Sequence, residues 1–194
     1  MTETENLPAP TVPTPYLTRI IRAAWLDSEL YEEVEADRSA TWQALGVVIL
    51  AGLASGIGML GHVSSLTFVV VNIVVAMLSW VIWAVMTYWI GVHVLPEPQT
   101  QSNVGELLRT TGFSSAPGLI RVLGAVPGVD DTVHQILYLG AAVWMLVAMV
   151  IAVRQALDYQ STWRAIGVCL IGWTVQAVIL IVTIRAAAYL PTGD

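Results

Sequence analysis

Long apolar segments constrain this sequence more than any other feature. Four of them, about 44–61, 66–95, 133–153 and 165–190, are long enough for a helix to cross a bilayer, which takes roughly 20 apolar residues. Only 11% of the 194 residues are charged, whereas a soluble domain carries roughly 25%. The apolar surplus needs lipid as its solvent, so we predict an all-α, polytopic membrane helical bundle.

A fifth apolar segment, about 104–126, is weaker and contains the stretch RTTGFSSAPG. Pro117 removes a helical hydrogen bond, Gly112 permits close backbone approach, and Ser114 can bond a freed carbonyl that lipid cannot satisfy. We therefore expect a broken helix that begins near Arg109. It is either a kinked helix buried against its neighbours or a discontinuous helix that lines a solute path. No acidic residue lies deep within the other spans, which favours the first interpretation.

The region before the first apolar segment has a different composition. Residues 1–15 hold four of the nine prolines and predict a disordered tail. Residues 16–39 predict a cytoplasmic arm of amphipathic and acidic helices, and residues 40–194 predict the membrane domain with about five transmembrane helices. Because the N-terminus lacks the positive charge and apolar core of a signal peptide, we expect the first span to act as an uncleaved signal.

The first part of the arm predicts a short amphipathic helix. Apolar residues recur between positions 17 and 25 at helical spacing. Arg19 and Arg22 lie off this stripe, so a helix lying in the membrane interface would direct them at lipid phosphates and hold Trp25 at headgroup depth. The stripe could instead pack on the protein's own bundle, and the two arrangements are compatible.

The positions of the arginines predict the orientation. With five spans and a cytoplasmic N-terminus, six of the eight arginines lie inside, and Arg121 and Arg185 lie outside, near helix ends where they can reach the interface. If the fifth apolar segment, third in chain order, only re-enters the membrane, the count is again six against two, with Arg154 and Arg164 outside. The charge bias therefore predicts a cytoplasmic N-terminus but leaves four and five spans open.

Small residues suggest where helices approach each other. Gly52 and Gly56 form a GxxxG pattern, and Gly140, Gly167 and Gly172 extend small surfaces on later spans. Such residues allow close helix packing in membranes. We expect these residues to pack helices within the bundle. The more specific alternative is that they form an interface between two copies of the chain.

Few polar residues lie inside the apolar segments. Asn72 and Gln176 do, and we expect each to bond to another helix. His62, His93 and His134 lie at span ends, where interfacial hydrogen bonding is the expected role, while binding of haem or another pigment by one of them is left open. No zinc or phosphate-loop motif is present, so we predict no cofactor and no metal.

Two stretches resemble a known family. GFSSAPGLI, at 112–120, resembles the third span of the Yip family, the Rab-interacting five-span membrane proteins and their bacterial relatives. RQALDYQSTWRAIGV, at 154–168, resembles the short loop of that family between spans four and five. The resemblance implies a bacterial member in the inner, cytoplasmic membrane. The arm lacks the Asp-Leu-Tyr-Gly-Pro-type motif of eukaryotic members, so binding to a Rab-type GTPase does not carry over.

The predicted function is not enzymatic, because no paired-carboxylate or serine-hydrolase motif is present. A net charge of −6 argues against nucleic acid as a partner. We expect a membrane scaffold or accessory protein, such as a subunit of a larger membrane complex. Its partners would be membrane lipids and the helices of other membrane proteins, a second copy of this chain among them.

The alternative is a small transporter or channel that uses the broken segment around Gly112–Pro117. This alternative makes a specific structural demand. A set of five polar residues would have to face one wet cavity: Asn72, Arg109, Ser114, Ser115 and Gln176.

Overall fold

The computed structural model describes residues 14–60 and 66–188, with side chains through Val178. Most of the predicted tail, and His62, lie outside the described residues. All elements in the described ranges are helical, which confirms the all-α class. In chain order they are α1 (Tyr16–Ala24), α2 (Ser28–Ala36), α3 (Ala40–Gly58), α4 (Leu66–Trp89), the π-helical turn η1 (Ile90–Val94), α5 (Val104–Phe113), the 3-10 helix η2 (Ala116–Ala125), α6 (Asp131–Ala156) and α7 (Thr162–Ala188).

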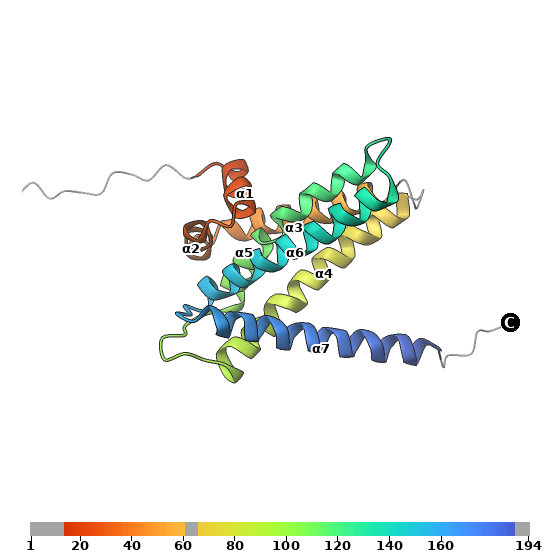
Figure 1. Ribbon diagram of the computed structural model, residues 1–194. Helices are drawn as coiled ribbons and strands as arrows, with labels where there is room; N and C mark the ends of the chain where they lie inside the picture. The colour runs from red at the N-terminus through yellow and green to blue at the C-terminus, as the bar shows by residue number, and fades with distance from the viewer. Residues whose placement is uncertain (1–13, 61–65, 189–194) are drawn as a thin grey trace, which may run out of the picture.

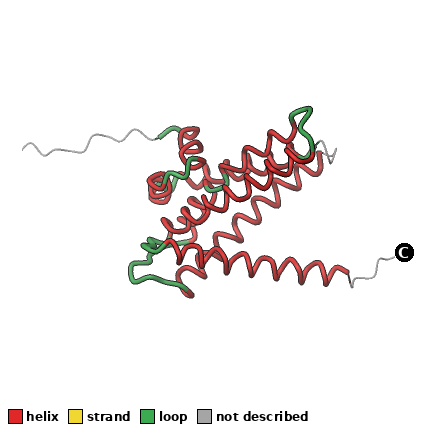
Figure 2. The backbone as a smooth tube through the Cα atoms, viewed as in Figure 1, coloured by secondary structure: helices red, strands yellow, loops and turns green. Residues whose placement is uncertain are grey.

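The longer helices form a bundle, and the N-terminal helices pack on it. α3, α4, α6 and the α5–η2 segment run side by side, with α1 and α2 against one part of this group (Figure 1). α7 starts beside α6 and η1 and then runs away from the other helices. The loops gather at the two ends of the bundle (Figure 2).

Three helices among the described residues are long and apolar enough to cross a membrane. They are Ala40–Gly58, Leu66–Val94 and Asp131–Ala156. This confirms a polytopic membrane protein, since each helix approaches or exceeds the roughly 20 residues that a bilayer requires. The number five stays a prediction, because it also counts the third segment and α7.

The third segment is two helices joined by a turn. α5 begins at Val104 with a capping box, in which the Asn103 side chain accepts from the Glu106 amide at 3.1 Å and the Glu106 carboxylate accepts from the Asn103 amide at 2.9 Å. α5 ends at Phe113, and η2 continues from Ala116. Pro117 lies in the first turn of η2, where its missing N–H would have no helical partner anyway.

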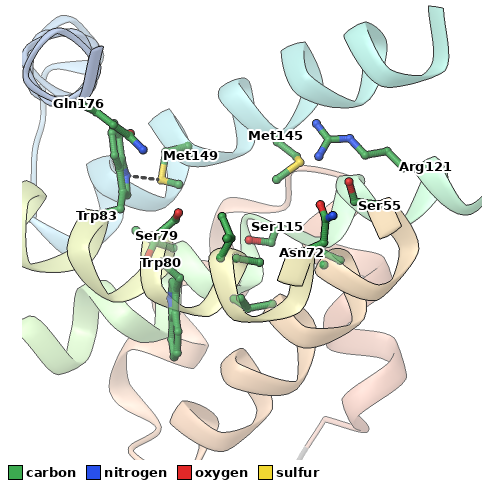
Figure 3. A pocket seen from close by; sticks show the side chains of 16 residues that line it. Ser55, Asn72, Ser79, Trp80, Trp83, Ser115, Arg121, Met145, Met149 and Gln176 are labelled. Atoms are coloured by element: carbon green, nitrogen blue, oxygen red, sulfur yellow. Dashed lines mark hydrogen bonds between the residues drawn. The ribbon is translucent and has the colours of Figure 1, made fainter. Parts of the chain in front are cut away.

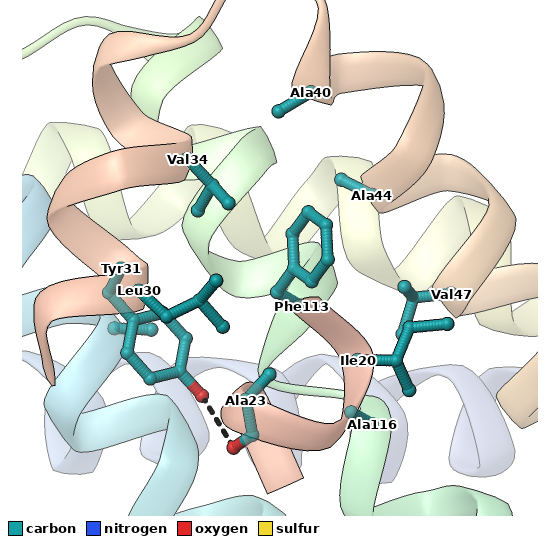
Figure 4. Close-up of a cluster of buried hydrophobic side chains, with 11 residues drawn as sticks. Ile20, Ala23, Leu30, Tyr31, Val34, Ala40, Ala44, Val47, Phe113 and Ala116 are labelled. Carbon is teal, nitrogen blue, oxygen red and sulfur yellow. Dashed lines mark hydrogen bonds between the residues drawn. The ribbon is translucent and has the colours of Figure 1, made fainter. Parts of the chain in front are cut away.

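One buried cluster joins the N-terminal arm to the bundle. Phe113 of α5 lies at its centre, between Leu30 and Val34 of α2 and Ala44 of α3 (Figure 4). All four side chains are fully buried. The Tyr31 hydroxyl closes the cluster by donating to the Ala23 carbonyl at 3.3 Å. The arm is therefore part of the folded core rather than a detached appendage.

A second cluster holds the start of α7. It unites residues of α4, η1, α5, α6 and α7, among them the fully buried Leu107. Tyr159, in the α6–α7 loop, donates its hydroxyl to the Gly91 carbonyl at 2.9 Å and lies 2.7 Å from the Leu95 carbonyl. These contacts fix the first turns of α7 and the end of α4 to each other.

Candidate functional site

Arg109, predicted at the start of the broken helix, binds the arm. Its side chain is only 6% exposed, and its Nε donates to the Val34 and Glu35 carbonyls, both at 3.0 Å. An Nη atom also donates to the Glu35 carbonyl. These carbonyls belong to the last turn of α2, where no helical N–H is available. Arg109 therefore caps α2 and does not line a path.

The two arginines of α1 bind carboxylates of the arm itself. Arg19, 4% exposed, forms ion pairs of 2.9 Å with Glu33 and with Asp37. Arg22 forms ion pairs of 2.7 Å with Asp27 and with Glu33. The hydrogen bond from Arg22 lowers the pKa of Asp27 below its usual range. The guanidinium groups that we expected at lipid phosphates are thus occupied by internal partners.

α1 presents apolar side chains outward. Leu17 is 67% exposed, Ile21 is also exposed and Trp25 is 79% exposed, while Ile20 and Ala23 pack in the arm cluster. A helix with charge inside and large apolar side chains outside has the polarity that a lipid environment favours. Packing on the bundle and contact with lipid are therefore compatible, and the depth of Trp25 stays a prediction.

Glu35 lies where the arm meets the bundle, beside the Arg109 cap. Burial, together with the nearby carboxylates of Asp158 and Glu106, raises the pKa of Glu35 to about 7. Arg109 opposes this shift but does not cancel it. The docked arm therefore contains a carboxyl group that titrates near neutral pH.

A cavity of about 300 Å³ lies between α3, α4, the third segment, α6 and α7 (Figure 3). Its walls are mostly apolar and include Trp80 and Trp83 of α4 and Met145 and Met149 of α6. Trp83 faces Met149, whereas Trp80 points toward α5 and donates to the Leu108 carbonyl at 3.0 Å. The Trp83 indole N–H points at the Met149 sulfur at 3.1 Å. Polar side chains also reach this space: Ser55, Asn72, Ser79, Thr111, Ser115, Arg121 and Gln176.

The cavity brings together only part of the set that a transport path demands. Asn72, Ser115 and Gln176 line it. Arg109 is bound to the arm, and the Ser114 hydroxyl donates to the carbonyl of Thr111 at 2.7 Å. The five residues therefore do not share one cavity.

Asn72 satisfies its amide locally. Its Nδ2 donates to the Phe68 carbonyl, one turn earlier in α4, at 2.9 Å. The expected bond to another helix is therefore not what holds this amide group. Thr174 behaves in the same way, donating to the Leu170 carbonyl at 2.8 Å. Asn72 and Thr174 thus each bond to the backbone of their own helix.

Arg121 of η2 is the residue whose role sequence reasoning missed. Its Nε is buried and has no hydrogen-bond partner in the part of the chain that the structure describes. Its guanidinium carbon lies 5.4 Å from the centre of the Tyr138 ring, and the Tyr138 hydroxyl donates to the Ser55 carbonyl at 2.6 Å. The sequence does show an arginine inside an apolar segment, but from the sequence we predict for it only a position near the membrane interface.

Gly52 and Gly56 pack α3 closely on α4. A Cβ atom at Gly52 would lie 3.1 Å from the Cα of Ile73, and one at Gly56 would lie 2.9 Å from the Cα of Val69. Real Cβ atoms rarely approach backbone atoms so closely. The GxxxG pattern therefore serves packing within this chain.

The later glycines differ from one another. A Cβ at Gly172 would meet the Trp83 ring at 3.0 Å, and one at Gly167 would meet Leu95 at 3.3 Å. A Cβ at Gly140 would meet no described atom within 4 Å. A packing role for Gly140 therefore requires a surface from outside the described part of the chain.

The two described histidines lie at opposite ends of the bundle. His93 stacks on Trp89 with 4.4 Å between ring centres. His134 stacks on Tyr138 at 4.5 Å, and its Nε2 lies 3.2 Å from the Met59 sulfur. Residues 14–60 and 66–188 contain no group of three or more metal-ligating side chains.

The fold and these sites define an all-helical, polytopic membrane protein whose N-terminal helices are packed on its bundle. The model of the Yip1 domain family matches residues 27–184, and the chain belongs to this family. The matched range begins at Asp27, the N-cap of α2, and includes most of α7. Comparisons with curated proteins and with solved structures find no match.

Proposed function

We propose that this Yip1-domain protein is a non-enzymatic scaffold or accessory subunit of the bacterial inner membrane. It binds helices of partner membrane proteins, and lipids, through its membrane bundle. It crosses the membrane five times with its N-terminus in the cytoplasm. Proteins of this family are generally non-enzymatic membrane proteins, which supports the first part of the proposal.

The departure of α7 from the bundle is the observation that carries this function. Ala165, Val168 and Cys169, in its first turns, are at most 1% exposed. From residue 174 to residue 178 all side chains are exposed, including Val175 at 40% and Val178 at 54%. The helix is thus anchored at one end, and the side chains at residues 174–178 are exposed where its backbone runs away from the bundle (Figure 1).

An open apolar helix face in a membrane can bind another helix. Association in lipid depends on close packing and on the exchange of lipid contacts for protein contacts. α7 leaves the bundle just after Gly172, which packs on Trp83 of α4. A partner helix can therefore contact α7 and α4 together, and this geometry favours a scaffold over a protein that acts alone.

The ends of the helices support the five-span topology. Gln155, at the end of α6, donates to Glu32 of the arm at 2.8 Å, and Arg109, at the start of the third segment, also binds the arm. If α6 crosses the membrane and ends on the arm side, the third segment must bring the chain to the other side. Ten α-helical and ten 3-10 residues span about 35 Å together, enough for a core of about 30 Å.

The cavity supports a transport path less well. Two of the five residues that such a path requires, Arg109 and Ser114, are bonded elsewhere. The polar residues that do reach the cavity lie among tryptophan and methionine side chains. A mostly apolar cavity suits an apolar ligand better than a hydrated solute.

Site-specific crosslinking in native membranes tests the scaffold function. A photoreactive amino acid replaces Val175 on α7, and in a control it replaces Val147 on α6. Val147 is exposed but, by helical spacing, lies on the opposite face of α6 from Ala142, Met145 and Met149, which line the space beside α7. We expect a single crosslinked product of defined mass from position 175 and none from position 147. A second copy of the chain would identify a self-assembling scaffold. Equal diffuse labelling from both positions would contradict the proposal.

A further inference from the structure

Arg121 is a cation in an apolar segment, and no acidic side chain of the described residues forms an ion pair with it. It belongs to η2, and none of the ion pairs formed among the described residues includes it. Its Nε is buried and unbonded. An arginine removed from water without an acceptor is unfavourable, so such residues in membrane segments generally face a partner or a ligand path.

The neighbours of Arg121 leave its donors available. The Tyr138 ring lies 5.4 Å below the guanidinium and stabilises the charge through its π-face. The carbonyl of Ser55, which lines the same cavity as Arg121, accepts a hydrogen bond from the Tyr138 hydroxyl and not from Arg121. The ring holds Arg121 in position, and the five N–H donors of a guanidinium suit a phosphate or a carboxylate.

Arg121 lies where two cavities meet. The first, of about 300 Å³, also contacts Asn72 and Ser55, and the second, of about 270 Å³, continues between α6 and Trp173 of α7. Trp83, Met145 and Met149 line both cavities along with Arg121. Figure 3 shows the Arg121 side chain extending toward the helix that carries Met145. One cationic group thus borders two largely apolar spaces.

We propose that these cavities bind the acyl chain of an anionic lipid, with Arg121 binding its phosphate or carboxylate. The apolar walls suit a hydrocarbon chain, and flexible methionines adapt to chains of different shape. Charge complementarity with Arg121 selects an anionic headgroup over a zwitterionic one. This inference deepens the lipid-binding part of the proposed function and rests on it, while partner-helix binding can fail or hold independently.

An acyl chain fits the site better than an acidic side chain of a partner helix. The space continues from Arg121 past Met145 and Met149 to the tryptophans of α4 and α7, so it is elongated and mostly apolar. Its volume is at the small end of ligand pockets, roughly 300 to 1,000 Å³. An aspartate or glutamate side chain would occupy only the end beside the guanidinium.

Quenching of tryptophan fluorescence tests the proposal with the purified full-length protein. The protein is placed in nanodiscs that contain a small fraction of phosphatidylglycerol or of phosphatidylcholine with brominated acyl chains. Bromine quenches tryptophan on contact, so the four exposed tryptophans are first replaced by phenylalanine in every protein compared: Trp25, Trp42, Trp89 and Trp163. In this background, quenching of Trp80 and Trp83 reports a chain in the cavity. We expect brominated phosphatidylglycerol to bind about tenfold more tightly, the size of one charge-assisted hydrogen bond.

Four variants locate the effect. Arg121→Gln should abolish the preference for the anionic lipid, and Arg121→Lys should retain most of it. Ser79→Leu, which fills the cavity and leaves Arg121 in place, should reduce the contact quenching of both lipids. Arg38→Gln removes an exposed arginine of the arm and should change nothing. The Lys and Leu variants keep the test valid if Arg121→Gln fails to fold.

Several outcomes would overturn the proposal. Equal quenching by the two lipids in the unmodified protein would remove the headgroup selectivity, and an unchanged preference in Arg121→Gln would assign it elsewhere. Displacement of the brominated lipid by millimolar inorganic phosphate would identify a site for free anions instead. A crosslinked partner at position 175 without lipid selectivity would leave the scaffold function standing and reject this inference alone.

Discussion

The two halves of the broken third segment, α5 and η2, place their arginines in opposite environments. In α5, Arg109 is almost fully buried and donates to the Val34 and Glu35 carbonyls. In η2, Arg121 is partly buried, with an unbonded Nε beside a cavity. A buried guanidinium whose acceptors come from its own chain is a structural element. One to which the described residues supply an aromatic ring but no acceptor for its Nε is available to a ligand.

The largest expected effect is a loss of stability when the packing of α5, the first half of the third segment, is removed. Phe113→Ala empties the centre of the arm cluster, and truncating a fully buried phenylalanine costs about 3–5 kcal/mol. The matched change in the second half, Leu123→Ala, removes a side chain that is 45% exposed and should cost much less. Thermal unfolding in one detergent, followed by circular dichroism, compares the two variants. Similar losses would contradict the assignment of Phe113 to the core.

The second prediction exchanges the two arginines for methionine. Arg109→Met leaves carbonyls of α2 unsatisfied, and we expect a loss of about 2–3 kcal/mol and release of the arm. Release is measured by trypsin cleavage after Arg22 and Arg38. Arg121→Met should leave both the melting temperature and the cleavage rate nearly unchanged. If both variants lose stability equally, Arg121 has a structural role that our comparison denies.

The third prediction compares two glycines. Gly56→Ala forces a Cβ to 2.9 Å from the Cα of Val69, and overpacking of this kind costs about 1–3 kcal/mol. Gly140→Ala meets no described atom within 4 Å, so improved helix propensity should stabilise the protein by up to about 1 kcal/mol. The readout is the melting temperature of each variant. Destabilisation by Gly140→Ala would indicate a contact with another chain.

The smallest expected effect concerns pH. Glu35 has a pKa of about 7 in the folded protein against an ordinary value of 4.5, so the folded state binds its proton more tightly than the unfolded state. The docked arm is therefore most stable at acidic pH, and it loses stability as pH rises from 4.5 until the loss levels off above about 7. Glu35→Gln should be increasingly more stable than the unmodified protein across this range.

The control for the pH prediction is an exposed acidic residue on the same helix. Glu29→Gln should differ from the unmodified protein by an amount that does not grow between pH 5 and pH 8. Melting temperatures of all three proteins in one buffer series provide the comparison. A pH-independent difference for Glu35→Gln would show that the carboxyl group is charged throughout and that its surroundings are more polar than the structure indicates.

Features set by local sequence could be predicted, and features set by distant contacts could not. The lengths of the apolar segments predicted helices, and the Gly52–Gly56 pattern predicted a close approach. The acceptors of Arg109 belong to residues 74 and 75 positions earlier in the chain. No periodicity or local motif reports such a pairing, so Arg109 was grouped with the residues of a possible path.

The arm illustrates the same limit. Helical spacing placed Arg19 off the apolar stripe, which suggested contact with lipid phosphates. Its actual partners, Glu33 and Asp37, lie on the next helix and beyond it, and their position depends on the turn after α1. For Arg121, the sequence showed a charge in an apolar segment, but only the packing of five elements around it creates the cavity.

The cap on α2 also has a consequence for the order of events during synthesis. The carbonyls of Val34 and Glu35 leave the ribosome 74 to 75 residues before Arg109 does. At 5 to 20 residues per second, this delay is roughly 4–15 s. During that time the arm has no stable end and is open to proteases and chaperones. Docking of the arm then requires that α5 has been made through Arg109 and that this part of α5 lies on the same side of the membrane as the arm.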